Sequence, residues 1–225
     1  MLKIGHRGAK GHAPENTLIS FRKAVDMQVD GIELDVHRSA DGELMVIHDE
    51  TIDRTTNGKG FVNRLSLREL KGVLIENKHQ IPTLEEVLDL VNQECFVNIE
   101  LKSYETAEKT VELIEKYIEE KNWNYDRFLV SSFDWNALQQ VRFLNDEIPI
   151  GVLTETDLDL ALAFAKFIQA KSIHPHFHLL TKANTARMQE KRLQVIPWTI
   201  NKTEDIQKIK SFKVNGIITD FPNRI

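Results

Sequence analysis

Two histidines early in the chain stand in settings that suit proton transfer. His6 lies in the tetrapeptide Gly-His-Arg-Gly at residues 5–8, and His48 follows the apolar run 44–47 and precedes Asp49. Histidine titrates near neutral pH, so one member of such a pair can accept a proton while the other donates one. A lone histidine at the end of a strand is more often structural. Two of them flanking a cluster of acids favour general acid–base catalysis.

The acids that accompany them form a repeated pattern. Glu33 and Asp35 are two residues apart in an apolar run, so both point to one face of a strand, where they must be neutralised. Glu100 and Lys102 repeat the spacing further along. Each pair alone could be a salt bridge. Together they indicate a divalent cation held by Glu33, Asp35 and Glu100, and oxygen ligands favour Ca²⁺ or Mg²⁺ over zinc.

Cationic and aromatic side chains supply candidate substrate contacts. Arg7 offers a fork of donors and Lys102 a point charge, and both suit phosphate oxygens. Trp198 could form a wall of the substrate pocket or, equally well, belong to the core or rim. Glu15 has even chances of reaching the site, and Asp49 could orient His48 or bond the local backbone.

Short apolar runs alternate with amphipathic helical patterns along the chain. The runs are 3–5, 32–36, 44–48, 96–101, 128–132, 150–154, 172–177, 195–200 and 216–219. This alternation predicts an α/β fold, a TIM (β/α)₈ barrel. These are nine runs, one more than the eight strands of such a barrel. Only a polar turn separates 32–36 from 44–48, too short for a parallel crossover, so these two should pair as a hairpin that lowers His48 onto the site.

Residues 51–81 are the one long break in the alternation. They predict a small insertion over the C-terminal mouth of the barrel, with a short helix from Ser66 through Leu70. Thr83 with Glu86 predicts a capping box, and Asn201 with Glu204 predicts another. Without repeats or linkers, we expect one domain over residues 1–225.

Composition excludes several classes of protein. The net charge of −5 argues against a nucleic-acid partner. No leader precedes the His6 motif and no run approaches ~20 apolar residues, so we expect a cytoplasmic protein without stable membrane insertion. Three histidines at 174, 176 and 178 look like a zinc motif, but Pro175 interrupts them and no carboxylate completes the set. Zinc is not expected there.

Six motifs in order resemble the glycerophosphodiester phosphodiesterases. They are Gly-His-Arg-Gly at 5–8, Pro-Glu-Asn-Thr at 14–17, Glu-Leu-Asp-Val at 33–36, His-Asp at 48–49, Glu-Leu-Lys at 100–102 and Gly-Ile-Ile-Thr-Asp at 216–220. Each is weak alone, whereas the ordered set is specific.

The resemblance implies a TIM barrel with an insertion after the second histidine and one divalent cation, Ca²⁺ or Mg²⁺, on Glu33, Asp35 and Glu100. It implies His6 and His48 as general acid and base. The same resemblance makes Arg7 and Lys102 phosphate ligands and places Trp198 near the glycerol. Implied substrates are small glycerophosphodiesters such as glycerophosphocholine and glycerophosphoethanolamine, cleaved to sn-glycerol 3-phosphate and an alcohol.

Several alternatives stay open. They are attack by water or by the substrate's own hydroxyl, the acid and base roles within the histidine pair, the headgroup preference and the oligomeric state. Rival hypotheses are a lysophospholipase D-like enzyme on the same fold and a metal- and phosphate-binding protein without activity.

Overall fold

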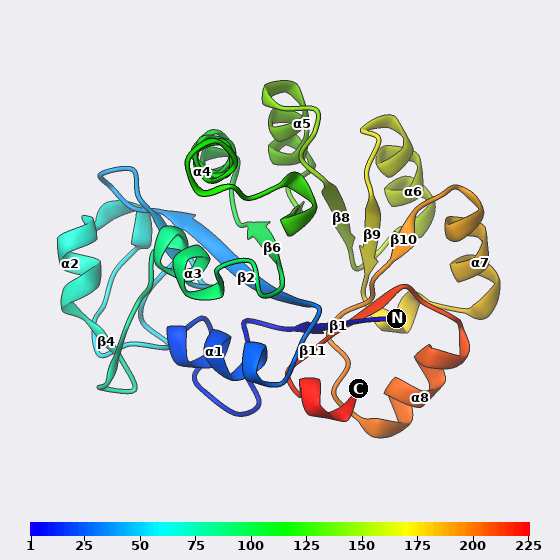
Figure 1. The fold of residues 1–225 in the computed structure, drawn as a ribbon, viewed down its shortest axis with the longest axis horizontal. Coiled ribbons are helices and arrows are strands. Elements are labelled where there is room, and N and C mark those ends of the chain that lie inside the picture. Colours follow the sequence, from blue (N-terminus) through cyan, green and yellow to red (C-terminus); the bar gives the residue numbers. More distant parts are fainter.

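A nearly closed barrel of parallel strands forms the centre of the computed structural model, which describes residues 1–225 (Figure 1). The strands run in the order β10-β9-β8-β7-β6-β2-β1-β11. Their bounds are β1 (Leu2–Gly5), β2 (Gly31–Arg38), β6 (Phe96–Leu101), β7 (Phe128–Ser132), β8 (Ile150–Thr154), β9 (Ser172–Pro175), β10 (Gln194–Val195) and β11 (Gly216–Thr219). The predicted TIM barrel is confirmed.

Irregular backbone closes the barrel between β10 and β11. The run predicted as a strand over 195–200 is a strand only at Gln194–Val195. Pro197 has no N–H for a ladder, which ends the regular pairing early. The chain still joins its neighbour, because the N–H of Ile200 donates to the carbonyl of Ile218 at 3.0 Å and the N–H of Ile218 donates to Pro197 at 3.0 Å.

Helices follow the strands and surround them (Figure 1). They are α1 (Leu18–Asp26), α3 (Leu84–Val91), α4 (Ala107–Lys121), α5 (Trp135–Leu144), α6 (Leu158–Phe167), α7 (Lys182–Glu190) and α8 (Thr203–Ser211). After β11 there is only a 3₁₀ turn, Pro222–Arg224. The capping box predicted at Thr83 is confirmed. The one predicted at Asn201 is wrong, because Lys202 occupies the cap position and the Asn201 amide binds Asp220 instead.

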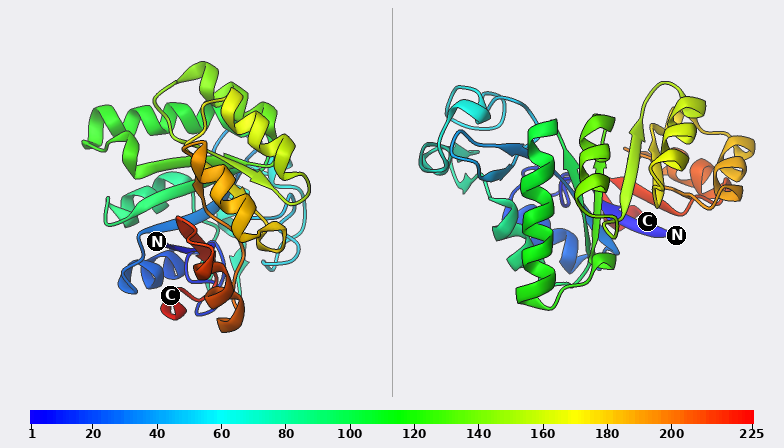
Figure 2. Two further views of the ribbon diagram at one scale, coloured as in Figure 1. Left: turned by 90° about the vertical axis from the view of Figure 1, so that its right-hand side faces the viewer. Right: turned by 90° about the horizontal axis from the view of Figure 1, so that it is seen from above.

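The hairpin predicted from the strand excess is present. β3 (Leu44–Val46) pairs antiparallel with the C-terminal end of β2 and with no other barrel strand. It leads into a segment with α2 (Leu67–Gly72), β4 (Leu74–Ile75) and β5 (His79–Gln80). Figure 2 shows this cyan segment at one end of the molecule, away from α7. A small apolar cluster that includes Met45, Ile52 and Leu70 fills its interior.

Two apolar layers leave the charged side chains at the barrel mouth. The main core lies between the strands and the surrounding helices. Inside the barrel, Ile4, Ile196 and Ile218 form a separate cluster with Leu2, Phe96 and Trp198 packed against it. Ionisable groups inside the barrel are therefore concentrated where the strands end. None of the helices combines the length and the apolar character needed to cross a bilayer.

Candidate functional site

Three carboxylates converge at the C-terminal ends of two neighbouring strands. β2 and β6 pair in register, so that Asp35 lies opposite Glu100. One oxygen each from Glu33, Asp35 and Glu100 lie within 4.8 Å of one another, close enough to bind one ion together. Glu33 and Asp35 are both buried, and β2 places no cationic side chain between them.

Two cations reach this cluster from either side. The Lys102 ammonium lies 2.7 Å from Glu100 and 3.4 Å from Asp35. Arg7 places its Nε 3.3 Å from Asp35, and its backbone N–H donates to Glu33 at 2.9 Å. Two positive side chains therefore face three carboxylates, and the cluster retains excess negative charge.

The pKa values of the three acids reflect this imbalance. Burial, together with Asp35 and Glu100, raises the pKa of Glu33 well above its ordinary value. Burial and Asp35 raise the pKa of Glu100 to about 7. Burial opposes ionisation of Asp35 as well, but Lys102 and Arg7 outweigh it and lower the pKa of Asp35. A divalent cation would supply the missing positive charge, and a set of buried oxygen donors fits a hard ion such as Ca²⁺ or Mg²⁺.

A tight turn after β1 aims Arg7 at the cluster. Arg7 itself has a φ of 50°, and its carbonyl accepts from the Ser20 hydroxyl at 2.9 Å. Gly8 has a φ of +83°, and a Cβ there would come within 2.5 Å of the Ser20 Oγ. At Gly5 a Cβ would meet the Gly8 carbonyl oxygen at 2.5 Å. Both glycines are required by this close packing.

His6 is oriented by an acid from the far end of the chain. Its Nδ1 lies 2.6 Å from Asp220 Oδ1, and the Asn201 amide donates to the other Asp220 oxygen at 2.8 Å. A carboxylate can only accept, so Nδ1 carries the proton and Nε2 keeps its lone pair. Burial lowers the pKa of His6, and the charge of Arg7 adds to this, against the opposing effect of Asp220.

His48 is held in the same way by its neighbour in sequence. Its Nδ1 lies 2.7 Å from Asp49 Oδ1, which settles the alternatives left open for Asp49. The Arg54 guanidinium donates to both Asp49 oxygens and to Glu15. Burial lowers the pKa of His48 as well. Because Asp49 is fixed by Arg54, the ring of His48 has a stable partner.

Glu15 does reach the site, as a link between cations. It accepts from Arg7 at 2.8 Å and from Arg54 at 2.7 Å. Burial by itself would raise the pKa of Glu15, but Arg54 and Arg7 outweigh burial and lower this pKa to about 2. Glu15 thus connects the turn that carries Arg7 to the insertion that follows His48.

These groups surround a cavity of about 100 Å³ at the barrel mouth. Trp198 and Phe133 line one side and pack edge to face, with ring centroids 5.4 Å apart. The Trp198 indole N–H donates to the His174 carbonyl at 2.8 Å. The remaining lining residues are His6, Arg7, Glu33, His48, Asn98, Glu100, Lys102, Leu153, Thr199 and Ile218. The cavity therefore has both charged and apolar lining residues.

All but one of the site residues predicted from sequence line this cavity, and the exception, Asp35, lies directly against it. Sequence reasoning left Asp220 without a role and missed Asn16, whose buried amide donates to Asp35 at 2.9 Å. It also missed Asn98, whose Oδ1 is buried without a partner. Asn98 is two residues before Glu100 on the same strand face, so that spacing was an available signal.

The three histidines near the end of β9 do not converge on one point. His174 is buried, and its Nε2 lies 2.8 Å from the Ser172 hydroxyl. His176 and His178 stack on each other with ring centroids 5.0 Å apart. The one group of acids and histidines close enough for an ion is that of Glu33, Asp35 and Glu100.

Known proteins match this chain over nearly its whole length. The sequence model of the Glycerophosphoryl diester phosphodiesterase family matches residues 6–224. A glycerophosphodiester phosphodiesterase of Caldanaerobacter subterraneus is 38% identical over 100% of this chain and 96% of its own, and one of Bacillus altitudinis is 40% identical with the same coverage.

Solved structures show the same likeness. A phosphodiesterase of Oleispira antarctica, in complex with the product sn-glycerol-3-phosphate, superposes with a TM-score of 0.91 at 28% identity. The match covers 99% of this chain and 94% of that one. With its barrel, its acidic cluster and these full-length matches, the protein belongs to the glycerophosphoryl diester phosphodiesterase family of enzymes.

Proposed function

We propose that the protein hydrolyses small glycerophosphodiesters, such as glycerophosphocholine and glycerophosphoethanolamine, to sn-glycerol 3-phosphate and an alcohol. The observation that carries this proposal is the site itself: two histidines, each with a carboxylate on Nδ1, share one cavity with Glu33 and Glu100. The product bound to the Oleispira antarctica phosphodiesterase supports the same reaction.

Glu33, Asp35 and Glu100 would hold one Ca²⁺ or Mg²⁺ ion, whose charge would stabilise negative charge on the phosphoryl oxygens. Arg7 and Lys102 line the same cavity and would bind the remaining phosphate oxygens. Trp198 and Phe133 would pack against the carbon atoms of the glycerol.

His6 and His48 would move the protons. Each has its Nδ1–H bound to a carboxylate, so each presents Nε2 as the reactive atom. One Nε2 takes the proton of the attacking hydroxyl, and the other, protonated, donates to the leaving alcohol. Burial keeps both pKa values low, which suits the base, while the approaching phosphate raises the pKa of the histidine that acts as acid. Either ring can fill either role in this geometry.

The deciding experiment is a panel of glycerophosphodiesters assayed for release of sn-glycerol 3-phosphate, with and without a chelator. We expect turnover that the chelator abolishes and that added Ca²⁺ or Mg²⁺ restores. His6→Ala and His48→Ala should each lower kcat by about 10²- to 10⁴-fold. His12→Ala, which removes an exposed histidine, serves as the matched control.

Three results would contradict parts of the proposal. Full activity in either histidine variant would refute the acid–base roles, and full activity with chelator would refute the metal. Turnover of lysolipids in preference to the deacylated diesters would favour the lysophospholipase D alternative. The cytoplasmic location remains a prediction from sequence.

A further inference from the structure

A second, larger pocket lies beside the catalytic cavity, and no step proposed above uses it. It measures about 410 Å³ and is polar, with Ala40 and Phe61 as its hydrophobic lining residues. Lys102 lines both this pocket and the catalytic cavity. The two spaces are therefore neighbours across one side chain that faces the phosphate site.

The fold builds this pocket from three segments. The end of β2 supplies His37 and Arg38, and the chain after β6 supplies Lys102 with Glu105 close behind. Glu50, directly before the insertion, and Phe61 and Asn63 within it form the third wall. Backbone contacts hold this wall together: the N–H of Val62 donates to the Glu50 carbonyl at 2.9 Å, and Thr51 bridges to Phe61.

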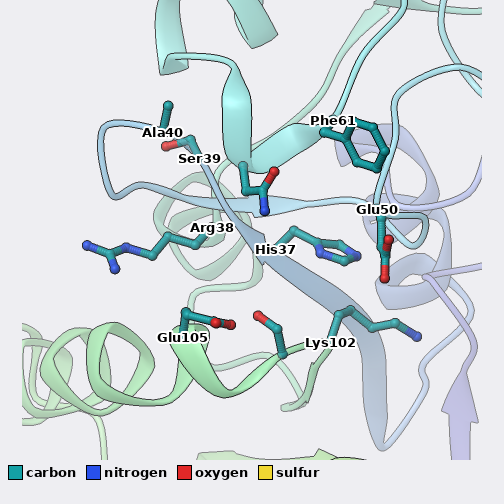
Figure 3. Close-up of a pocket in the computed structure, with 10 residues that line it drawn as sticks. His37, Arg38, Ser39, Ala40, Glu50, Phe61, Lys102 and Glu105 are labelled. Atoms are coloured by element: carbon teal, nitrogen blue, oxygen red, sulfur yellow. The ribbon is translucent and has the colours of Figure 1, made fainter.

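The charged groups are divided between the two ends of the pocket. Figure 3 shows Arg38 and Glu105 at one end, and Glu50 and Lys102 at the other. The negative charge of Glu105 is stabilised by its neighbours, because a backbone N–H, the Ser103 hydroxyl and the charge of Arg38 lower its pKa. Lys102 is engaged with Glu100 and Asp35.

Glu50 acts on His37 of the same pocket, where its charge favours a higher pKa of that ring, but it has no ion-pair partner. Its carboxylate makes no ion pair within 4.0 Å and no hydrogen bond with another side chain, and it is exposed to the pocket. Phe61, 42% exposed, stands in the same wall. Its ring already accepts the Arg64 guanidinium at 4.9 Å on one face, which shows that it can pack against a cation. An unpaired carboxylate beside an aromatic ring favours a small organic cation.

We infer that this pocket receives the alcohol half of the diester and that Glu50 makes it selective for alcohols that carry an ammonium group. The inference rests on the proposed function, because it takes the phosphate to lie at Lys102. A short aminoalcohol leaving from that phosphate would extend towards the end of the pocket where Glu50 lies. There the ammonium would meet the carboxylate, and Phe61 would shield it from water.

The test compares two substrates in one enzyme. The specificity constant kcat/KM is measured for glycerophosphoethanolamine, which has a cationic headgroup, and for glycerophosphoglycerol, which has a neutral one. Glu50→Gln should lower the ratio of the two constants about three- to fivefold, mainly through KM for the cationic substrate. Glu50→Lys should lower it further. Free ethanolamine, tested as a competitive inhibitor, should bind more weakly to both variants.

Glu76→Gln is the matched control, because Glu76 is an exposed acid of the insertion that does not line the pocket. It makes the same change of net charge and should leave the ratio unchanged. Selectivity of the wild type should also fall with added salt, because exposed charges are screened, whereas selectivity of Glu50→Gln should not. Activity on the neutral substrate reports that each variant is folded.

The outcomes separate the two claims. If the wild type cleaves neither diester, the proposed function fails, and the headgroup inference fails with it. If the wild type cleaves both and Glu50→Gln leaves the ratio unchanged, the reaction stands and the role of Glu50 is refuted. A ratio that falls equally in Glu76→Gln would assign the effect to general electrostatic attraction and would also overturn the inference.

Discussion

His6 and His48 have equivalent carboxylate partners that lie at very different distances along the chain. Asp49 adjoins His48, whereas Asp220 is 214 residues from His6. In both cases the carboxylate fixes the tautomer, so that Nε2 is the atom available for proton transfer. Asp220 is therefore a positioning residue for His6.

The first prediction concerns this contact. Asp220→Asn should lower kcat by about 10- to 100-fold, with a smaller change in KM. This loss is only part of the full contribution of acid–base catalysis, because the His6 ring itself remains. An amide can donate to Nδ1, which favours the tautomer with the proton on Nε2. Steady-state kinetics over a range of pH checks it, with Asp26→Asn, an exposed acid without side-chain contacts, as control. Wild-type kcat in Asp220→Asn would contradict the orienting role.

The second prediction concerns protons and metal at the acidic cluster. Burial and Asp35 raise the pKa of Glu100 to about 7, and burial raises that of Glu33. These acids must be ionised to hold a cation, so protons compete with the metal as pH falls. The affinity for Ca²⁺ or Mg²⁺ should therefore decrease as pH falls below about 7, by up to about tenfold per pH unit for each carboxyl that must lose its proton.

Calorimetric titrations of the metal at pH 6, 7 and 8 measure this directly. Proton release on binding, obtained from buffers of different ionisation enthalpy, should be largest at pH 6. An affinity that is constant over this range would show that the three acids are already ionised without the metal.

At the scale of elements, the turn between β1 and α1 controls the geometry of the site. It contains Arg7 and Gly8, both with positive φ, and it packs directly against Ser20 of α1. The strand and the helix together therefore decide where the Arg7 side chain points.

The third prediction tests that packing. Gly8→Ala introduces a Cβ 2.5 Å from the Ser20 Oγ and 2.6 Å from the Ser20 carbonyl carbon, at a φ of +83°. We expect a loss of about 1–3 kcal/mol in the free energy of unfolding. Gly72→Ala, where a Cβ meets no atom within 4 Å, should change stability little. Urea denaturation of both variants makes the comparison, and equal stabilities would contradict the account of the turn.

At the scale of the whole molecule, the insertion has its own apolar core and is also joined to the barrel by polar contacts. The two ends of the insertion are held together, because the N–H of Val46 before it donates to the carbonyl of Pro82 after it at 2.8 Å, and Arg54 within it reaches across to Glu15. Lys71 ion-pairs with Glu86 of α3 and donates to the Ile81 carbonyl at 2.9 Å. We propose that barrel and insertion unfold as one domain.

The fourth prediction follows from this arrangement. Thermal unfolding should show one transition, with the same midpoint by circular dichroism and by the reactivity of Cys95. Cys95 is buried in the main core, and burial raises the pKa of its thiol to about 12. The thiol should therefore react with a disulfide reagent at pH 8 only as the protein unfolds. Separate midpoints, or a thiol that reacts in the folded protein, would contradict a single unit.

Local sequence was enough to predict much of this protein. Spacing of two along a strand places Glu33 with Asp35 and Glu100 with Lys102, since strand geometry alternates side chains between faces. The short turn before Leu44 was enough to separate the hairpin strand from the barrel strands, because a parallel crossover needs more chain. Those rules act over a few residues, and the structure confirms the barrel and the hairpin.

What sequence alone could not provide depends on contacts between distant segments. Asp220 reaches His6 because the first and last strands of the barrel are neighbours, which no local rule states. Asn201 has the sequence of a helix cap, yet its amide satisfies Asp220 because that acid lies next to it in space. The strength of each carboxyl group as an acid likewise depends on burial and on neighbours from other strands.

The amino-acid sequence by itself determined which side chains are available for chemistry and which face of its strand each occupies. Only the tertiary structure decided their charge balance: three carboxylates against two cations in one cluster, and Glu50 without an ion pair in the pocket beside it. The physical reason is that electrostatic energy depends on distance and on exclusion of water, and barrel closure sets both.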